Sequence, residues 1–132
     1  MNQTRSLAQR ELSHSILDGV IDRKWISASA HASIFISVFI LSIGIPIFIY
    51  LDSEDLVIKE NTKEAINFHV NLWLYGAIIA LLSFVTFGVL GLILVPIWFV
   101  YHWGLSILAV IHCLRNPDKP FYYPLMFRIY LK

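Results

Sequence analysis

Residues 65–114 read AINFHVNLWLYGAIIALLSFVTFGVLGLILVPIWFVYHWGLSILAVIHCL and contain no Asp, Glu, Lys or Arg over fifty positions. A water-soluble helix of that length needs a charged face, so this stretch indicates a lipid bilayer as its surroundings. One crossing takes about 20 residues, which makes the run long enough for two. Residues 25–51 form a second uncharged run. Backbone groups in lipid must be bonded internally, and strict apolar/polar alternation is missing, so we predict an all-α integral membrane protein.

The composition agrees with one small membrane domain. The 132 residues are 58% hydrophobic and 14% charged, with a mean hydropathy of +0.69. A formal net charge of +1 without a clustered basic face gives no reason to propose a nucleic-acid partner. The single cysteine, Cys113, cannot form an intrachain disulfide, and no Cys/His spacing resembles a zinc site, so we predict no metal site.

Residues 1–24 are predicted to form an amphipathic surface helix. Its apolar residues recur at helical intervals opposite the charges: Leu12, Ile16, Leu17, Val20 and Ile21. The segment has no apolar core of the kind found in a cleavable signal peptide, so the hydrophobic run that follows is expected to act as an uncleaved anchor. Three placements fit this stripe: along the membrane face, against a partner, or against the chain's own bundle.

Residues 25–114 are predicted to be the transmembrane domain, with three hydrophobic helices at about 26–51, 65–87 and 92–114. Arg23 and Lys24 beside Trp25 favour a cytoplasmic amino terminus, which places the acidic loop 52–64 on the other side. Three crossings place the two chain ends on opposite sides of the membrane, although both ends are basic and basic residues favour the cytoplasmic side. A two-crossing alternative, with residues 76–97 as the second span, keeps the ends together. We prefer three because residues 105–114 are too apolar to lie at a surface.

A polar stripe enters the second predicted span. Asn61 and Glu64 have the spacing of a capping box, which predicts a helix start near Thr62. On that helix Glu64, Asn67 and Asn71 share one face. Amide groups in lipid are costly unless they bond across to another helix. We therefore predict that this stripe is a packing face.

The tail, residues 115–132, begins with a turn sequence and continues with five aromatic residues around Pro124: Phe121, Tyr122, Tyr123, Phe127 and Tyr130. This composition indicates an interfacial segment and not a span. A disordered tail is poor in aromatic residues, so we expect this one to dock on the folded protein. A loose interfacial anchor is the alternative.

Several of these residues carry a resemblance to a known family. The pattern comprises a Trp and a His opening the first helix, a Pro near its end, an Ala-Ile-Asn-Phe block and a Tyr-Pro-Leu tail: Trp25, His31, Pro46, Ala65, Asn67, Phe68, Tyr123, Pro124 and Leu125. It resembles small bacterial membrane proteins grouped with the twenty-kilodalton subunit of the translocon at the inner chloroplast envelope, a Tic-like family. Asn61-Thr62 and His69 depart from the pattern. The resemblance implies a polytopic membrane protein and, for plastid members, a part in preprotein translocation.

No catalytic constellation is visible: there is no Ser/His/Asp set, no HExxH and no glycine-rich phosphate loop. We therefore predict a non-catalytic accessory or scaffold subunit of a larger membrane assembly, with membrane lipid and other membrane subunits as its partners. One alternative is a component of protein translocation or membrane insertion. The default location is the bacterial cytoplasmic membrane, while the resemblance adds a thylakoid or plastid membrane.

A second alternative is a haem- or chlorophyll-binding subunit. Three antiparallel spans would place His31 and His102 toward one leaflet and His69 and His112 toward the other. Such pairs are the arrangement that axial ligation of a cofactor needs. All four histidines lie near the ends of the predicted spans, where polar residues are common, so the primary prediction includes no cofactor.

Overall fold

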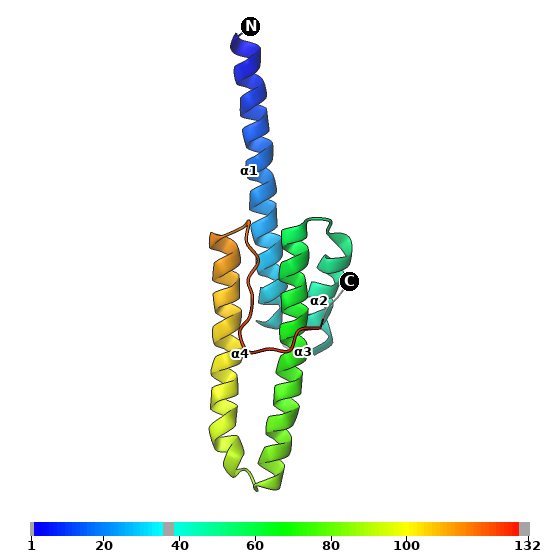
Figure 1. The fold of residues 1–132 in the computed structure, drawn as a ribbon, viewed down its shortest axis with the longest axis vertical. Helices are drawn as coiled ribbons and strands as arrows, with labels where there is room; N and C mark the ends of the chain where they lie inside the picture. Colours follow the sequence, from blue (N-terminus) through cyan, green and yellow to red (C-terminus); the bar gives the residue numbers. More distant parts are fainter. Residues whose placement is uncertain (1, 36–38, 130–132) are drawn as a thin grey trace.

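The computed structural model describes residues 2–35 and 39–129, and the side chains of residues 7–34 and 42–129. Within these ranges its regular elements are all helical: α1 (Asn2–Ala32), the 3-10 turn η1 (Ser33–Phe35), α2 (Phe39–Asp52), α3 (Leu56–Val85) and α4 (Val89–Arg115). The prediction of an all-α chain is confirmed. The helices lie along one long axis, and the extended tail after α4 returns along the bundle before crossing α3 (Figure 1).

α3 and α4 form a long hairpin, and both are long and apolar enough to cross a membrane. The uncharged part of α3, residues 65–85, is roughly 30 Å long at 1.5 Å per residue, which matches the hydrocarbon core of a bilayer. Large apolar side chains cover the outside of the hairpin: Phe84 is 83% exposed, Phe87 99% and Leu92 80%. A protein in water does not leave so large a patch uncovered, so lipid is the medium that suits these helices.

The two helices reverse direction at residues 86–88. Gly88 has φ +89°, a left-handed conformation that glycine adopts without steric cost. Gly91 lies inside α4, because this helix begins at Val89, three residues before the predicted span at about 92. Its role is close packing, because a Cβ there would lie 2.6 Å from the Oγ of Ser83 on α3.

The predicted first span, residues 26–51, is not one helix. Its first part is the end of α1, and the chain then turns through η1 and comes back as α2, which lies beside α3. Pro46 lies within α2 and has no N–H for the carbonyl of Ser42, four residues earlier. The hydroxyl of Ser33 donates to that carbonyl at 2.8 Å and so joins η1 to α2. The continuous-span prediction fails because α1 ends at Ala32 and α2 is a separate helix, which the bond from Ser33 ties to the turn η1.

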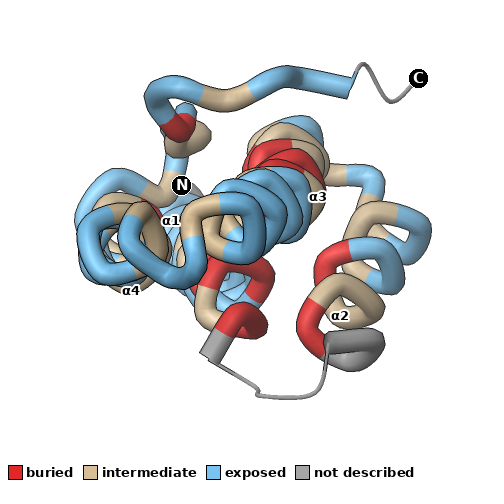
Figure 2. The backbone as a smooth tube through the Cα atoms, turned by 90° about the horizontal axis from the view of Figure 1, so that it is seen from below, coloured by how far each residue is buried: buried red, intermediate tan, exposed pale blue. Residues whose placement is uncertain are grey.

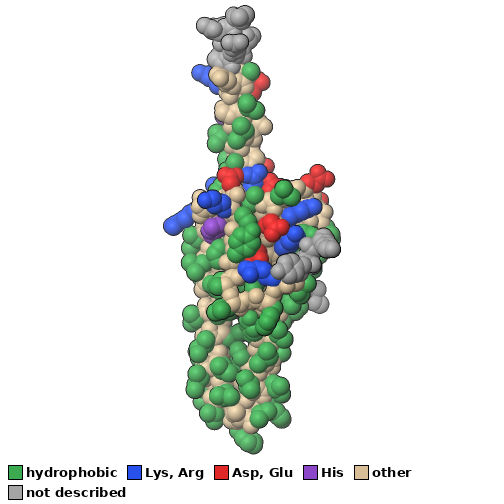
Figure 3. All heavy atoms as spheres, viewed as in Figure 1, with side chains coloured by type: hydrophobic (Ala, Val, Ile, Leu, Met, Phe, Trp, Pro, Cys, Tyr) green, Lys and Arg blue, Asp and Glu red, His purple; other side chains and the backbone are tan. Residues whose placement is uncertain are grey.

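The charged side chains gather at one end of the bundle (Figure 3). Arg23 of α1 binds Asp55, at the start of α3, with 2.7 Å between Nε and Oδ2, and also binds Asp118 of the tail. The acidic loop 52–64 therefore lies beside Arg23 and not across the membrane from it. This contradicts the predicted sidedness of the loop, which assumed that residues 26–51 cross the bilayer.

The amino-terminal part of α1 projects beyond the bundle (Figure 1). Every residue from 7 to 19 is exposed, including Leu7, Leu12, Ile16 and Leu17. Of the three placements open to the amphipathic stripe, packing against the chain's own bundle is therefore excluded for this stretch. We call residues 7–19 the projecting arm.

The core lies where α1, α3, α4 and the tail meet. It contains Ile34, Phe68, Leu72, Ala109 and Tyr123. Figure 2 shows that buried positions lie on the inner faces of α1, α2 and α3, with the tail running along the outside of α3. Small residues let the helices approach closely, among them Ala28, Ala30, Ala65, Ser106 and Cys113, all of which are buried.

Candidate functional site

The polar stripe on α3 holds the backbone of the tail. Asn71 accepts from the N–H of Phe127 at 2.8 Å and donates to its carbonyl at 2.7 Å. Asn67 makes the same pair of bonds to Ile129, at 2.7 and 3.2 Å. The two amides thus bind alternate residues of an extended segment, as the edge of a sheet would. The sequence predicted another helix as the partner of this stripe, whereas the structure places the tail there.

Glu64 completes the stripe at its charged end. One carboxylate oxygen accepts from the Tyr123 N–H at 3.1 Å, and the other accepts from Nε of Arg128 at 2.9 Å. The Glu64 side chain is almost fully buried, so the bond to Arg128 compensates the cost of placing a carboxylate there. The capping-box prediction at Asn61 is wrong. α3 begins at Leu56, because Asp55 caps it by accepting from the N–H groups of Val57 and Ile58.

His31 and Asn61 form a buried polar centre between α1, α3 and the tail. The Asn61 Oδ1 atom lies 3.1 Å from His31 Nε2, and it also accepts from the Phe121 N–H at 3.0 Å. Cys113 Sγ lies 3.4 Å from the same oxygen. His31 Nδ1 lies 2.8 Å from the Tyr123 hydroxyl. One histidine and one asparagine therefore connect three separate segments of the chain.

The partners fix the protonation pattern of this centre. The Asn61 oxygen can only accept, so Nε2 of His31 carries a proton and its Nδ1, in neutral imidazole, accepts from Tyr123. Burial raises the pKa of the Tyr123 hydroxyl well above its ordinary range, so the hydroxyl keeps its proton and remains a donor. The Tyr123 ring stacks on Phe68, with 3.9 Å between centroids and 5° between planes.

Two tyrosines that the sequence analysis did not single out also hold the tail. The hydroxyl of Tyr101 donates to the carbonyls of Pro124 and Leu125 at 3.0 and 3.2 Å, and the hydroxyl of Tyr75 donates to Leu125 at 2.8 Å. Pro124 and Leu125 are themselves exposed, so their backbone and not their side chains is bound. Tyr75 and Tyr101 lie in the middle of the predicted spans 65–87 and 92–114, where a single tyrosine gives no sequence signal of a partner in the tail.

The ion pair at the charged end fastens α1 to α3. Burial alone would raise the pKa of Asp55, but the bonds from Arg23 and from the N–H groups of Ile58 and Val57 outweigh it and lower the pKa. The pKa of Arg23 is raised, chiefly by its hydrogen bond to Asp55. Trp25, two residues further on, is 58% exposed beside Lys24, whose ammonium lies 5.4 Å from the ring centroid.

The structure groups the four candidate histidine ligands differently from the prediction. His31 and His112 both lie against the ring of Phe121, and His69 and His102 line a pocket between α3 and α4. The expected pairs, His31 with His102 and His69 with His112, are therefore not formed. In the part of the chain whose side chains are described, no three His, Cys, Asp or Glu residues are placed to hold a metal ion together.

A comparison with protein-family models gives a match over residues 22–130, to MamF/MmsF, described as the magnetosome magnetite crystal formation protein family. Comparisons with curated proteins and with solved structures give no match. The Tic-like resemblance is thereby wrong, and the translocation role and the thylakoid or plastid location that depended on it lose their support. The motif residues Ala65, Phe68 and Tyr123 are explained by packing, because all three are buried around the docked tail. The match spans most of the 132 residues, and the chain belongs to the MamF/MmsF family.

Proposed function

We propose that this chain is a non-catalytic accessory protein of a bacterial membrane, serving a membrane on which magnetite crystals form. The family description supplies the biological setting. The accessory role is supported by one observation, the position of the charged residues at only one end of the apolar hairpin. All ten Lys and Arg residues lie outside residues 65–114, and the hairpin presents only its apolar turn to the opposite leaflet.

This architecture supports a protein that works at one face of its membrane. The α3–α4 hairpin is the anchor, and the bonded tail makes the charged end rigid. Basic residues remain on the cytoplasmic side of bacterial membranes, so the charged end and the projecting arm face the cytoplasm. Membrane lipid surrounds the hairpin, and other membrane subunits are the partners that the arm's apolar residues fit.

A complementation experiment tests the proposal. In a magnetite-forming bacterium that lacks its own family member, the full chain should restore crystal size, measured by electron microscopy. Leu12→Glu with Ile16→Glu alters only the projecting arm, so this double variant should insert normally but fail to restore crystal size. Gln9→Glu with Ser13→Glu is the matched control, because it adds the same charge at two exposed polar positions and should restore it.

Two results would contradict this account. If the full chain is present in the membrane and crystal size stays unrestored, this chain does not serve a membrane on which magnetite forms. If the arm variant restores crystal size as well as the control does, the arm is not a partner surface, and the accessory role loses its structural support.

A further inference from the structure

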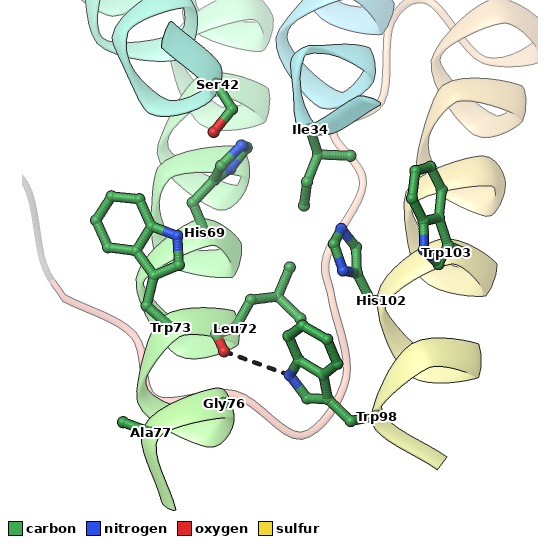
Figure 4. Close-up of a pocket in the computed structure, with 10 residues that line it drawn as sticks. All are labelled: Ile34, Ser42, His69, Leu72, Trp73, Gly76, Ala77, Trp98, His102 and Trp103. Carbon is green, nitrogen blue, oxygen red and sulfur yellow. Dashed lines mark hydrogen bonds between the residues drawn. The ribbon is translucent and has the colours of Figure 1, made fainter. Parts of the chain in front are cut away.

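A pocket of about 400 Å³ lies between α3 and α4, below the end of α1 (Figure 4). His69 and His102 extend into it from opposite helices, and it is also lined by Leu72 and three of the chain's four tryptophans, Trp73, Trp98 and Trp103. Its size is within the range of small-molecule sites, and such sites combine apolar walls with a few polar groups. The polar stripe and the docked tail do not account for this pocket.

Among the side chains that the structure describes, two buried histidine nitrogens in the pocket have no hydrogen-bond partner: Nε2 of His69 and Nε2 of His102. His69 is only 2% exposed, and its Nδ1 lies 2.7 Å from the carbonyl of Ala65. A carbonyl only accepts, so Nδ1 carries the proton, and in neutral imidazole Nε2 is then a lone-pair acceptor. A buried acceptor without a partner is unfavourable, so the pocket suits a molecule that brings a donor.

The lining restricts the chemistry of that molecule. None of the described residues that line the pocket is Lys, Arg, Asp or Glu. The propionates of a haem would find no cation there, and a bare divalent ion would meet two neutral imidazoles and no carboxylate to balance its charge. An acyl chain would fill the space but leave both nitrogens unbonded. The indole N–H of Trp98 already donates to the carbonyl of Leu72 at 3.3 Å, and this bond holds the indole ring at the side of the pocket.

We propose that this pocket binds a neutral, lipid-soluble aromatic molecule with ring hydroxyl groups, of the quinol class. One hydroxyl donates to Nε2 of His69, a second group bonds Nε2 of His102, and the ring packs among the indoles, which favour offset or edge contacts with aromatic ligands. A quinol carries hydroxyl donors, whereas the corresponding quinone carries only acceptors. Because Nε2 of His69 can only accept a hydrogen bond, the pocket should bind the quinol more tightly than the quinone.

Tryptophan fluorescence tests this directly. Trp25, the remaining tryptophan, is outside the pocket, so Trp25→Phe gives a protein whose emission reports the pocket alone. In mild detergent, menadiol kept reduced should quench this emission saturably and bind more tightly than menadione. His69→Leu should weaken menadiol binding about tenfold, the equivalent of one lost hydrogen bond. His69→Gln keeps an acceptor and should retain part of the affinity.

Two further variants keep the test decisive. His14→Leu, in the projecting arm, is the control and should bind menadiol as the parent does. Ala77→Phe enlarges a side chain that lines the pocket and leaves both histidines unchanged. It should therefore weaken menadiol binding even if His69→Leu fails to fold. Unsaturable quenching, equal affinity of the parent and the His69→Leu or Ala77→Phe variants, or tighter binding of menadione would overturn the proposal. A Soret band or a stoichiometric metal that His69→Leu abolishes would replace the quinol with haem or metal.

Discussion

At the scale of single residues, Tyr123 joins the tail to the bundle in two ways, through its hydroxyl on His31 and its ring on Phe68. Tyr123→Phe keeps the ring stack but leaves Nδ1 of His31 buried without a partner. We expect a loss of about 1–2 kcal/mol in the free energy of unfolding in detergent. Tyr122→Phe is the matched control, because Tyr122 is exposed. If both variants unfold alike, the His31–Tyr123 bond does not contribute to stability.

Asp55 makes the stability depend on pH. Its pKa in the folded protein lies below the ordinary 3.8, so its pairing with Arg23 is fully present above that value and is lost as the pH falls through the lowered pKa. Asp55→Asn keeps a good helix cap and removes only the charge. The difference in unfolding free energy between wild type and this variant should be constant from about pH 7 to 5 and shrink below about pH 4. A difference that grows on acidification would exclude the pairing.

The sequence predicted the polar stripe but not its partner. Helical periodicity alone places Glu64, Asn67 and Asn71 on one face. An extended segment some sixty positions away leaves no periodic signal, so the partner could not be identified. The interpretation of Asn61 as a helix cap was wrong because a residue outside its capping-box motif caps the helix. Its capping spacing was genuine, but Asp55 lies six positions earlier and caps the helix there.

At the scale of elements, the tail is held by side chains of α3 and α4 and has no strand or helix of its own after Arg115 in the described chain. Asn67→Leu with Asn71→Leu removes four bonds to the tail backbone while making α3 more apolar. We expect normal membrane insertion and a tail that chymotrypsin cleaves faster at Phe127. Asn116→Leu, at the exposed end of α4, should leave the cleavage rate unchanged. Equal rates in both variants would mean that the stripe does not hold the tail.

The break between α1 and α2 was beyond the reach of the sequence. Residues 25–51 are uncharged, and an uncharged window of that length predicts a span whether the chain crosses the membrane or turns back. A proline such as Pro46 indicates a bend in its own helix, which is a local effect. The bond from Ser33 to the carbonyl of Ser42 depends on the tertiary arrangement, because the two residues lie in different elements.

At the scale of the whole molecule, two crossings agree better with the basic residues at both chain ends, because three crossings would place those ends on opposite sides of the membrane. With α1 turning back through η1, the acidic loop and the start of the tail lie at the same end of the bundle as Arg23, which meets Asp55 and Asp118 there. All ten Lys and Arg residues can then stay on the cytoplasmic side. The length of the uncharged run 65–114 predicted two long apolar helices correctly, whereas the equally uncharged run 25–51 is divided among α1, η1 and α2.

Cysteine labelling in sealed vesicles tests whether this chain crosses its membrane twice, as the two long apolar helices α3 and α4 predict. In a Cys113→Ala background, single cysteines replace Ala8 in the projecting arm, Glu54 in the acidic loop and Phe87 in the hairpin turn, all exposed positions. A membrane-impermeant maleimide should label positions 8 and 54 from the same, cytoplasmic face and position 87 only from the opposite face. Labelling of positions 8 and 54 from opposite faces would show that residues 26–51 cross the bilayer, and would contradict the account.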